Sequence, residues 1–289
     1  MQDPGQVFYS PPVRHKEHLR NMCRWLIVFF GVLVVMVVAL IVFAGRLAPL
    51  LPFSAEKNFV RPYEEMASRW FADGLGDGEI EAYLEELVDE VAAQMELPQE
   101  IELSVHYLDD GEKNAFATLG GHVFILRGIL ESVPDENSLV MVLAHELSHI
   151  KHRDPLASMG RGVALQMILS YFTGNSRQSE DLASLGGNLG LLSYSREQEA
   201  RSDMEALHLL HKRYGHVGGF DVFFRGFLRD DGGAEDALPT LFQPHPDIAV
   251  RIGYLEAAAE EHGYSVGRTT PFPDWMGGKL SVRMRESLL

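Results

Sequence analysis

The feature that most constrains this chain is an uncharged apolar run near its N-terminus. Residues 25–45, WLIVFFGVLVVMVVALIVFAG, are 21 residues without a charge. A helix of that length rises about 30 Å, the hydrocarbon thickness of a bilayer. The run exceeds the roughly 7–15 apolar residues of a cleavable signal, and Arg46 stands where small cleavage-site residues would be needed. The sequence therefore predicts a transmembrane anchor, with a cleaved signal as the weaker alternative.

The charges beside this run predict its orientation. Four basic residues precede it, whereas few follow it directly: Arg14, Lys16, Arg20 and Arg24 come before, and Arg46, Lys57 and Arg61 come after. Because positive residues stay on the cytoplasmic side, we expect residues 1–24 to be a cytoplasmic basic tail. Everything beyond residue 45 should then lie outside, in a bacterial periplasm at the inner membrane. Residues 46–78 contain several prolines and are expected to form a tether.

Composition narrows the partners of the part outside the membrane. The chain has 289 residues and a formal net charge of -16, which argues against nucleic acid as a partner. Its single cysteine, Cys23, excludes an intrachain disulfide. The domain must therefore be held together by its core, with a bound metal as a further contribution left open at this point.

Periodicity predicts an α+β domain over residues 79–265. Residues 79–95 have a helical apolar face, and residues 101–108 alternate as in a half-buried strand. Two further strand-like runs flank Gly120 and Gly121, which suggests a hairpin or bulge. The interrupted apolar stretch 155–195 is expected to be a buried helical hairpin, with shallow membrane contact as the alternative. Residues 266–289 are expected to be a tail.

The stretch LVMVLAHELSHIKHRD, residues 139–154, suggests a metal site. Apolar residues recur in it at intervals of three and four, which predicts a helix. His145 and His149 would lie one turn apart on one face, so both imidazoles can reach one ion. Glu146 points about 100° away and can reach a water held on that ion. This HExxH pattern favours zinc, but a third ligand is needed.

A second stretch, YSREQEARSDMEALHLL, predicts one helix over residues 194–210. It has strong helix formers and neither glycine nor proline. Glu199 and Asp203 stand four apart and share a face. Taken alone, such an acidic pair is more often solvated surface than a binding site.

Three motifs together resemble a known family. HELSH, then SREQEARSD, then HPDIAVRI at residues 245–252 are similar to motifs of the gluzincin family of membrane-associated zinc metallopeptidases, which includes HtpX, the CAAX prenyl proteases and the Oma-type proteases. NAFATLGGHVFILRGIL resembles the stretch that this family carries ahead of its zinc helix. The resemblance covers roughly residues 80–255 and implies a zincin-like fold, mainly helical with a small sheet, behind the anchor.

The resemblance also implies roles for individual residues. One zinc ion per chain would be held by His145, His149 and Glu199, with Glu146 as the general base. Asp203 and Arg196 would support the ligands, with Asp203 hydrogen-bonded to a zinc-binding histidine. His245, in the family's HP element, is expected to help stabilise the oxyanion or to gate the metal. The strand at Ala115, Phe116, Ala117 and Thr118 would pair with an extended substrate.

These expectations describe a zinc endopeptidase that cleaves misfolded envelope or membrane-associated proteins. CAAX processing fits less well, because the prenyl proteases have several transmembrane helices and this chain has one convincing span. The rival hypothesis is a zinc-stabilised chaperone or adaptor that binds unfolded clients, and Glu146 argues against it because structural zinc needs no base. Membrane-protein partners and self-association are left open by the sequence.

The predicted topology can be tested with thiol labelling. We expect an introduced cysteine, Ser287→Cys, to react with a membrane-impermeant thiol reagent in intact spheroplasts, while Cys23 stays unlabelled. The physical reason is the basic cluster before the apolar run, which holds the N-terminus inside. Labelling at Cys23 and protection at position 287 would place the domain in the cytoplasm.

Overall fold

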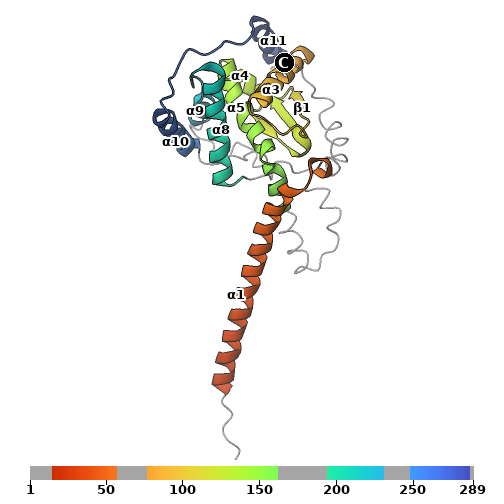
Figure 1. Ribbon diagram of the computed structural model, residues 1–289, viewed down its shortest axis with the longest axis vertical. Helices are drawn as coiled ribbons and strands as arrows, with labels where there is room; N and C mark the ends of the chain where they lie inside the picture. The colour runs from red at the N-terminus through yellow and green to blue at the C-terminus, as the bar shows by residue number, and fades with distance from the viewer. Residues whose placement is uncertain (1–14, 57–76, 162–193, 231–247, 287–289) are drawn as a thin grey trace, which may run out of the picture.

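The computed structural model describes residues 15–56, 77–161, 194–230 and 248–286. A long helix, α1 (His15–Leu47), extends away from a rounded domain that contains the other elements (Figure 1). Most of the large apolar side chains of α1 from Trp25 to Phe43 are exposed. Among the described residues, α1 belongs to the one helical stretch that is long and apolar enough to cross a membrane, Leu19–Leu50. This agrees with the anchor expected for residues 25–45.

The domain contains a small mixed sheet of three strands. Its order is β1 (Ser104–Leu108), β3 (His122–Leu126), β2 (Ala115–Ala117), with β1 parallel and β2 antiparallel to β3. The turn η2 (Leu119–Gly121) joins β2 to β3. Gly120 and Gly121 both have positive φ, 78° and 83°. These left-handed conformations explain why two glycines stand where the chain reverses. The hairpin suggested by the glycine pair is therefore present.

The rest of the domain is helical, and two helices, α5 and α8, lie at its centre. Figure 1 shows α5 and α8 side by side, with the sheet on one flank and α9 and α10 on the other. The helices beyond α1 are α3 (Gly78–Gln94), α4 (Arg127–Ser132), α5 (Glu136–Lys151), α8 (Arg196–Tyr214), α9 (Val222–Asp230), α10 (Ile248–Glu261) and α11 (Asp274–Glu286). The mainly helical α+β fold with a small sheet is thus confirmed.

Both central helices begin at residues whose side chains satisfy the first free backbone N–H groups. The carboxylate of Asp135 caps α5 by accepting a hydrogen bond from the Ser138 N–H at 2.9 Å. Ser195 and Gln198 form a reciprocal capping box at the start of α8. Gly215, with φ 74°, ends that helix in the left-handed conformation. These local signals fix where each helix starts, and hence which residues face the core.

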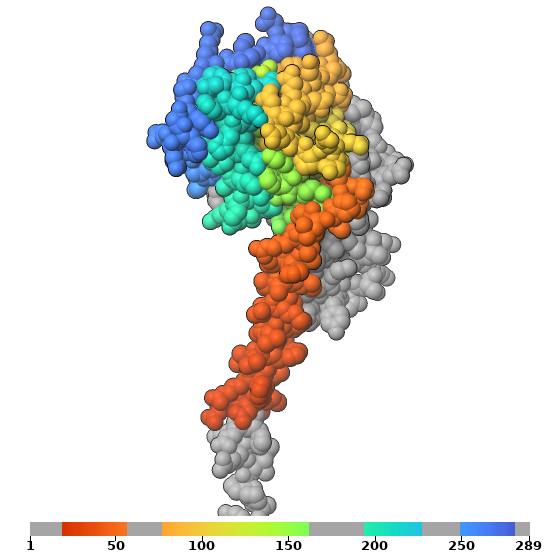
Figure 2. Space-filling model, in the orientation of Figure 1, coloured from red at the N-terminus to blue at the C-terminus, as the bar shows by residue number. Residues whose placement is uncertain are grey.

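The segment expected to be a tether contacts the domain. Within it, the short helix η1 is Ala48–Leu50, and residues 53–56 form one further helical turn. Phe53 and Glu56 are 7% and 5% exposed. Figure 2 shows the end of α1 lying against the part of the domain that follows α5 in the chain. A Cβ on Gly160, in the helical stretch 154–161, would lie 3.0 Å from the Cβ of Ala48, so the two backbones approach closely.

The C-terminal residues also differ from expectation. Instead of a tail, α11 packs on α3 and the core. Met276 is fully buried, Trp275 meets Tyr83 edge to face at 6.1 Å between ring centroids, and Lys279 pairs with Asp77 at 2.8 Å. Gly277 and Gly278 interrupt the helical pattern in the sequence, which conceals this helix from periodicity alone. The hairpin expected between residues 155 and 195 lies mostly outside the described residues.

Truncation of Met276 tests whether α11 belongs to the core. Met276→Ala should destabilise the domain by about 2–3 kcal/mol, because a fully buried side chain leaves a cavity. Denaturant unfolding of the full chain in detergent measures the loss. Lys279→Ala is the control and should cost far less, since its ion pairs are solvated. Equal stability of wild type and Met276→Ala would contradict the packing of α11.

Candidate metallopeptidase site

Two histidines of α5 converge at the centre of the domain. His145 and His149 are 4% and 0% exposed, and their rings meet edge to face with centroids 4.7 Å apart. Their Nε2 atoms are 3.1 Å apart. Two nitrogens bound to one tetrahedral zinc at about 2.0 Å would be separated by about 3.3 Å. The spacing predicted from one helical turn is therefore present, at a separation that suits one shared ion.

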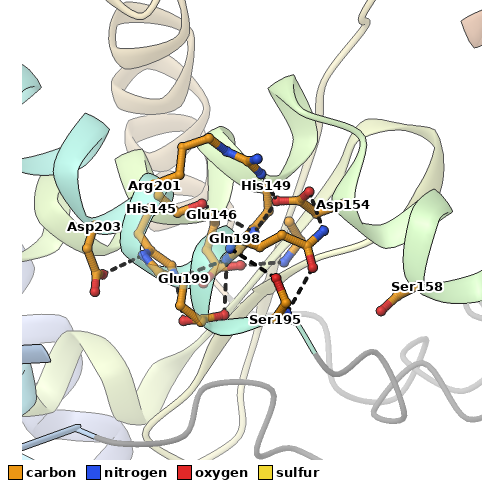
Figure 3. Close-up of polar contacts among 12 residues, drawn as sticks. His145, Glu146, His149, Asp154, Ser158, Ser195, Gln198, Glu199, Arg201 and Asp203 are labelled. Carbon is orange, nitrogen blue, oxygen red and sulfur yellow. Dashed lines mark hydrogen bonds and ion pairs between the residues drawn. The ribbon is translucent and has the colours of Figure 1, made fainter. Parts of the chain in front are cut away.

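Glu199 reaches the same point from α8. Its Oε1 lies 3.5 Å from the Nε2 of His149 and its Oε2 lies 3.5 Å from the Nε2 of His145 (Figure 3). The ligand atoms of these three buried residues all lie within 4.8 Å of one another. In the described part of the chain they are the one group of this kind. The acidic residue that looks like solvated surface in the sequence is 3% exposed.

Each imidazole has a carboxylate on its other nitrogen. The Nδ1 of His145 lies 2.8 Å from Asp203, and the Nδ1 of His149 lies 2.9 Å from Asp154. A carboxylate accepts the Nδ1 proton, so the Nε2 lone pair is the one presented to a metal. Two such lone pairs facing each other at 3.1 Å repel unless a cation lies between them. The donor set therefore fits zinc.

The charges around these carboxylates keep them ionised. Burial alone would raise the pKa of Asp203, but His145 and Arg251 outweigh this effect and hold the pKa well below its usual value. Asp154 behaves in the same way: burial opposes ionisation, while His149, Arg201 and Gln198 together lower its pKa. Both groups therefore remain hydrogen-bond acceptors at neutral pH.

Arg251 of α10 completes the surroundings of Asp203. Its Nε and Nη2 donate to the two oxygens of Asp203 at 2.8 and 2.6 Å, and its Nη1 lies 3.2 Å from Glu199. Tyr254 donates its hydroxyl to Asp203 as well. The guanidinium group also lies over the Phe224 ring, 4.6 Å from the centroid. One buried arginine thus compensates two carboxylates and fixes α10 against α8.

Sequence reasoning missed Arg251, Asp154 and Tyr194. Arg251 stands at helical spacing between Ile248 and Leu255, on the apolar face of α10. A charged residue on an apolar face indicates a buried ion pair, so the sequence held a sign of its role. Asp154 follows the end of α5, so no helical spacing relates it to His149. The Tyr194 ring stacks on His149 with centroids 4.0 Å apart, a contact between distant segments without a sequence signature.

Glu146 and the edge strand lie beside the three ligand candidates. Glu146 is 2% exposed, and its Oε2 accepts a hydrogen bond from the Ala117 N–H at 2.9 Å. The Thr118 N–H donates to the His122 carbonyl, and Phe116 lies opposite Phe124 in the ladder. Alternation then turns the backbone groups of Ala115 and Ala117 away from β3. The strand predicted to bind substrate therefore borders the site, with these groups along its outer edge.

Two predicted site residues are not brought into this group by the structure. Arg196 is exposed in the first turn of α8, and its supporting role stays a prediction. His245 lies outside the described residues, so its expected role beside the oxyanion or the metal also stays a prediction.

A buried HExxH helix, with an acidic residue delivered by a second helix, defines a metallopeptidase. The model of Peptidase family M48 matches residues 79–259, more than half of the chain. The chain therefore belongs to peptidase family M48, a family of zinc metalloproteases. With α1 as its apolar N-terminal helix, it is a membrane-associated member.

Individual relatives agree with this family. The Protease HtpX homolog of Acidiphilium cryptum (strain JF-5) is 29% identical over 212 residues, 60% of this chain and 72% of the relative. The mitochondrial metalloendopeptidase OMA1 of Schizosaccharomyces pombe is 31% identical over 158 residues, 54% of this chain and 47% of the relative. A Protease HtpX homolog of Aquifex aeolicus is 38% identical over 104 residues, about a third of each chain. The match to OMA1 thus spans less than half of that protein.

Removing the charge of Asp154 tests how His149 is oriented. Asp154→Asn should weaken zinc binding about 10–100-fold, the usual effect of losing a carboxylate that holds a metal-binding histidine. Competition with a chelator of known affinity measures the change. Asp77→Asn, which alters a helix cap far from the site, is the control. Zinc affinity equal to that of the wild type would show that Asp154 does not orient His149.

Proposed function

We propose that this chain is a membrane-anchored zinc endopeptidase that hydrolyses peptide bonds of envelope or membrane-associated proteins, misfolded ones above all. The observation that carries the proposal is the buried group of His145, His149 and Glu199 with Glu146 beside it. Membership of peptidase family M48 and the likeness to proteases named HtpX homolog and OMA1 support it.

The three buried side chains would hold one zinc ion per chain. A set of two histidines and one glutamate leaves a fourth position open, as in catalytic rather than structural sites. Zinc bound there would supply a Lewis acid that polarises the scissile carbonyl and lowers the pKa of a water molecule. Asp203 and Asp154 keep the two imidazoles in the tautomer that presents Nε2.

Glu146 would act as the general base and then as the acid. It would accept a proton from the attacking water and deliver that proton to the leaving amine. The Ala117 N–H donates a hydrogen bond to its Oε2 and so orients the carboxylate for this transfer. This same contact places the base at the edge of β2, where a substrate strand would pass.

The edge of β2 would bind an extended substrate segment. The backbone groups of Ala115 and the carbonyl of Ala117 turn away from β3 and can pair with any extended peptide, so recognition would depend little on side chains. Segments of unfolded proteins satisfy this requirement, which supports broad specificity. His245 would stabilise the oxyanion or gate the metal from the HP element.

The anchor would place this site on the outer face of the membrane. The basic residues before the apolar run support a cytoplasmic N-terminus and a periplasmic domain. Residues 1–24 would form the basic tail and 25–45 the membrane span, and the protease domain would follow from residue 79. The length of the apolar run, beyond that of a cleavable signal, supports a retained anchor over a cleaved signal. A chaperone or adaptor without hydrolysis is not favoured, since Glu146 sits beside the ligand candidates.

The decisive experiment separates metal binding from hydrolysis. Glu146→Gln should keep zinc but reduce cleavage of labelled casein by about 10²–10⁴-fold, because the general base is lost. Glu199→Ala should lose both zinc and activity. Metal content by mass spectrometry and initial cleavage rates measure these outcomes in the full chain in detergent.

The matched control is Glu90→Gln, a replacement of an exposed carboxylate on α3 that should leave both zinc content and cleavage unchanged. Cleavage by Glu146→Gln at the rate of the wild type would refute the mechanism. Full metal occupancy in Glu199→Ala would refute the ligand set.

A further inference from the structure

One carboxylate from the segment next to the membrane lies between two parts of the candidate site. Glu56 follows the end of α1 at Leu47 by nine residues and is 5% exposed. Its two carboxylate oxygens accept hydrogen bonds from different segments. One donor is in the turn after β2, and the other is Arg153, just beyond α5. Both of these segments are adjacent in sequence to groups that the proposed reaction uses.

The first oxygen holds the turn that ends the edge strand. Oε1 of Glu56 accepts a hydrogen bond from the Gly120 N–H at 2.8 Å. Gly120 lies three residues after Ala117, whose N–H holds Glu146. The turn itself is closely packed, because a Cβ on Gly121 would lie 2.3 Å from the Glu102 carbonyl oxygen. The position of Glu56 is therefore transmitted to the end of the strand that borders the base.

The second oxygen holds Arg153, two residues beyond the end of α5. Oε2 of Glu56 accepts a hydrogen bond from the Nε of Arg153 at 2.6 Å. The Nη1 of Arg153 also donates to the Leu51 carbonyl at 3.1 Å, and its guanidinium lies 5.5 Å from the centroid of the Phe53 ring. The segment 51–56 thus surrounds this one side chain.

Arg153 needs such support because its backbone is in an uncommon conformation. Its φ is 59°, in the left-handed region of backbone conformation. Residues other than glycine and asparagine rarely adopt this conformation. The conformation reverses the chain after α5 and brings the next residue, Asp154, back to the Nδ1 of His149 at 2.9 Å. The contact with Glu56 therefore supports the backbone turn on which the orientation of His149 depends.

We propose that Glu56 is a positioning residue of the peptidase, through which the juxtamembrane segment sets the distance between the substrate strand and the metal-binding helix. This inference rests on the proposed function for the reaction that is positioned. Glu56 touches neither substrate nor metal; it acts through Gly120 on β2 and Glu146, and through Arg153 on Asp154 and His149.

The test uses the full chain in detergent with an internally quenched peptide. Glu56→Gln keeps an acceptor for Gly120 but places an amide against Arg153, while Glu56→Ala removes both contacts. We expect kcat/KM to fall about 10-fold in Glu56→Gln and about 100-fold in Glu56→Ala, with a raised KM and unchanged zinc content. Arg153→Gly removes the strain of the left-handed backbone conformation. It also removes the contact between Arg153 and Glu56 that Glu56→Gln weakens, so it should resemble that variant.

Two further measurements separate positioning from a purely structural role. Hydrogen exchange in residues 115–126 should become faster in Glu56→Ala, which loses the bond to Gly120, and much less so in Glu56→Gln, while α3 keeps its protection in both. The visible absorption of the cobalt-substituted protein should change as well, because His149 is reoriented. The matched control is Glu136→Gln, which alters a carboxylate that bridges Tyr83 and Tyr214 at the other end of α5 and should leave kcat and KM unchanged.

Three results would overturn the proposal. They are a kcat/KM of Glu56→Ala within twofold of the wild type, an equal loss in Glu136→Gln, or a lower kcat that follows the folded fraction with KM unchanged. Lost protection in α3 in either Glu56 variant would likewise show a purely structural role. A wild-type chain that cleaves no peptide would contradict the proposed function instead, and hydrogen exchange in residues 115–126 would then decide the role of Glu56.

Discussion

The packing of α5 against α8 is the interaction on which the rest of the site depends. Residues 137–150 of α5 are all buried, including two histidines and a glutamate. Burying such groups is costly unless each is paired. The facing residues of α8 meet this requirement, because Glu199 and Asp203 approach the two sides of His145. Without α8, His145 would lose both of these carboxylates inside an apolar core.

The pairing extends outward in a definite order. Asp203 and Glu199 are compensated by Arg251, and Asp154 is compensated by Arg201. These cations come from α10 and α8. The buried carboxylates around the two histidines therefore help to hold these helices in place. The sheet joins the centre through the hydrogen bond from the Ala117 N–H to Glu146. The catalytic arrangement and the arrangement of the elements are therefore largely the same set of contacts.

Sequence reasoning succeeds where function follows from local spacing. A spacing of four between His145 and His149 suffices to place two imidazoles on one face, and the run of strong helix formers predicts the helix over residues 194–210. Glu199 required the family resemblance, because an acidic residue on a helix carries no sign of burial. Asp154 and Arg251 depend on where separate segments meet, and Gly277 and Gly278 conceal α11. What could not be predicted is therefore mostly tertiary: contacts between elements that no period in the sequence links.

The origin of the three ligand candidates on two helices has a thermodynamic consequence. An ion that binds only when α5 and α8 are packed stabilises the folded state by mass action, by about 1.4 kcal/mol for each tenfold rise of free zinc above its dissociation constant. The folded fraction then depends on the zinc activity of the compartment that the domain occupies. Where zinc is scarce, the same two helices lose this contribution, and the protein becomes easier to unfold and to degrade. The abundance of the protein would thereby follow the supply of its own metal.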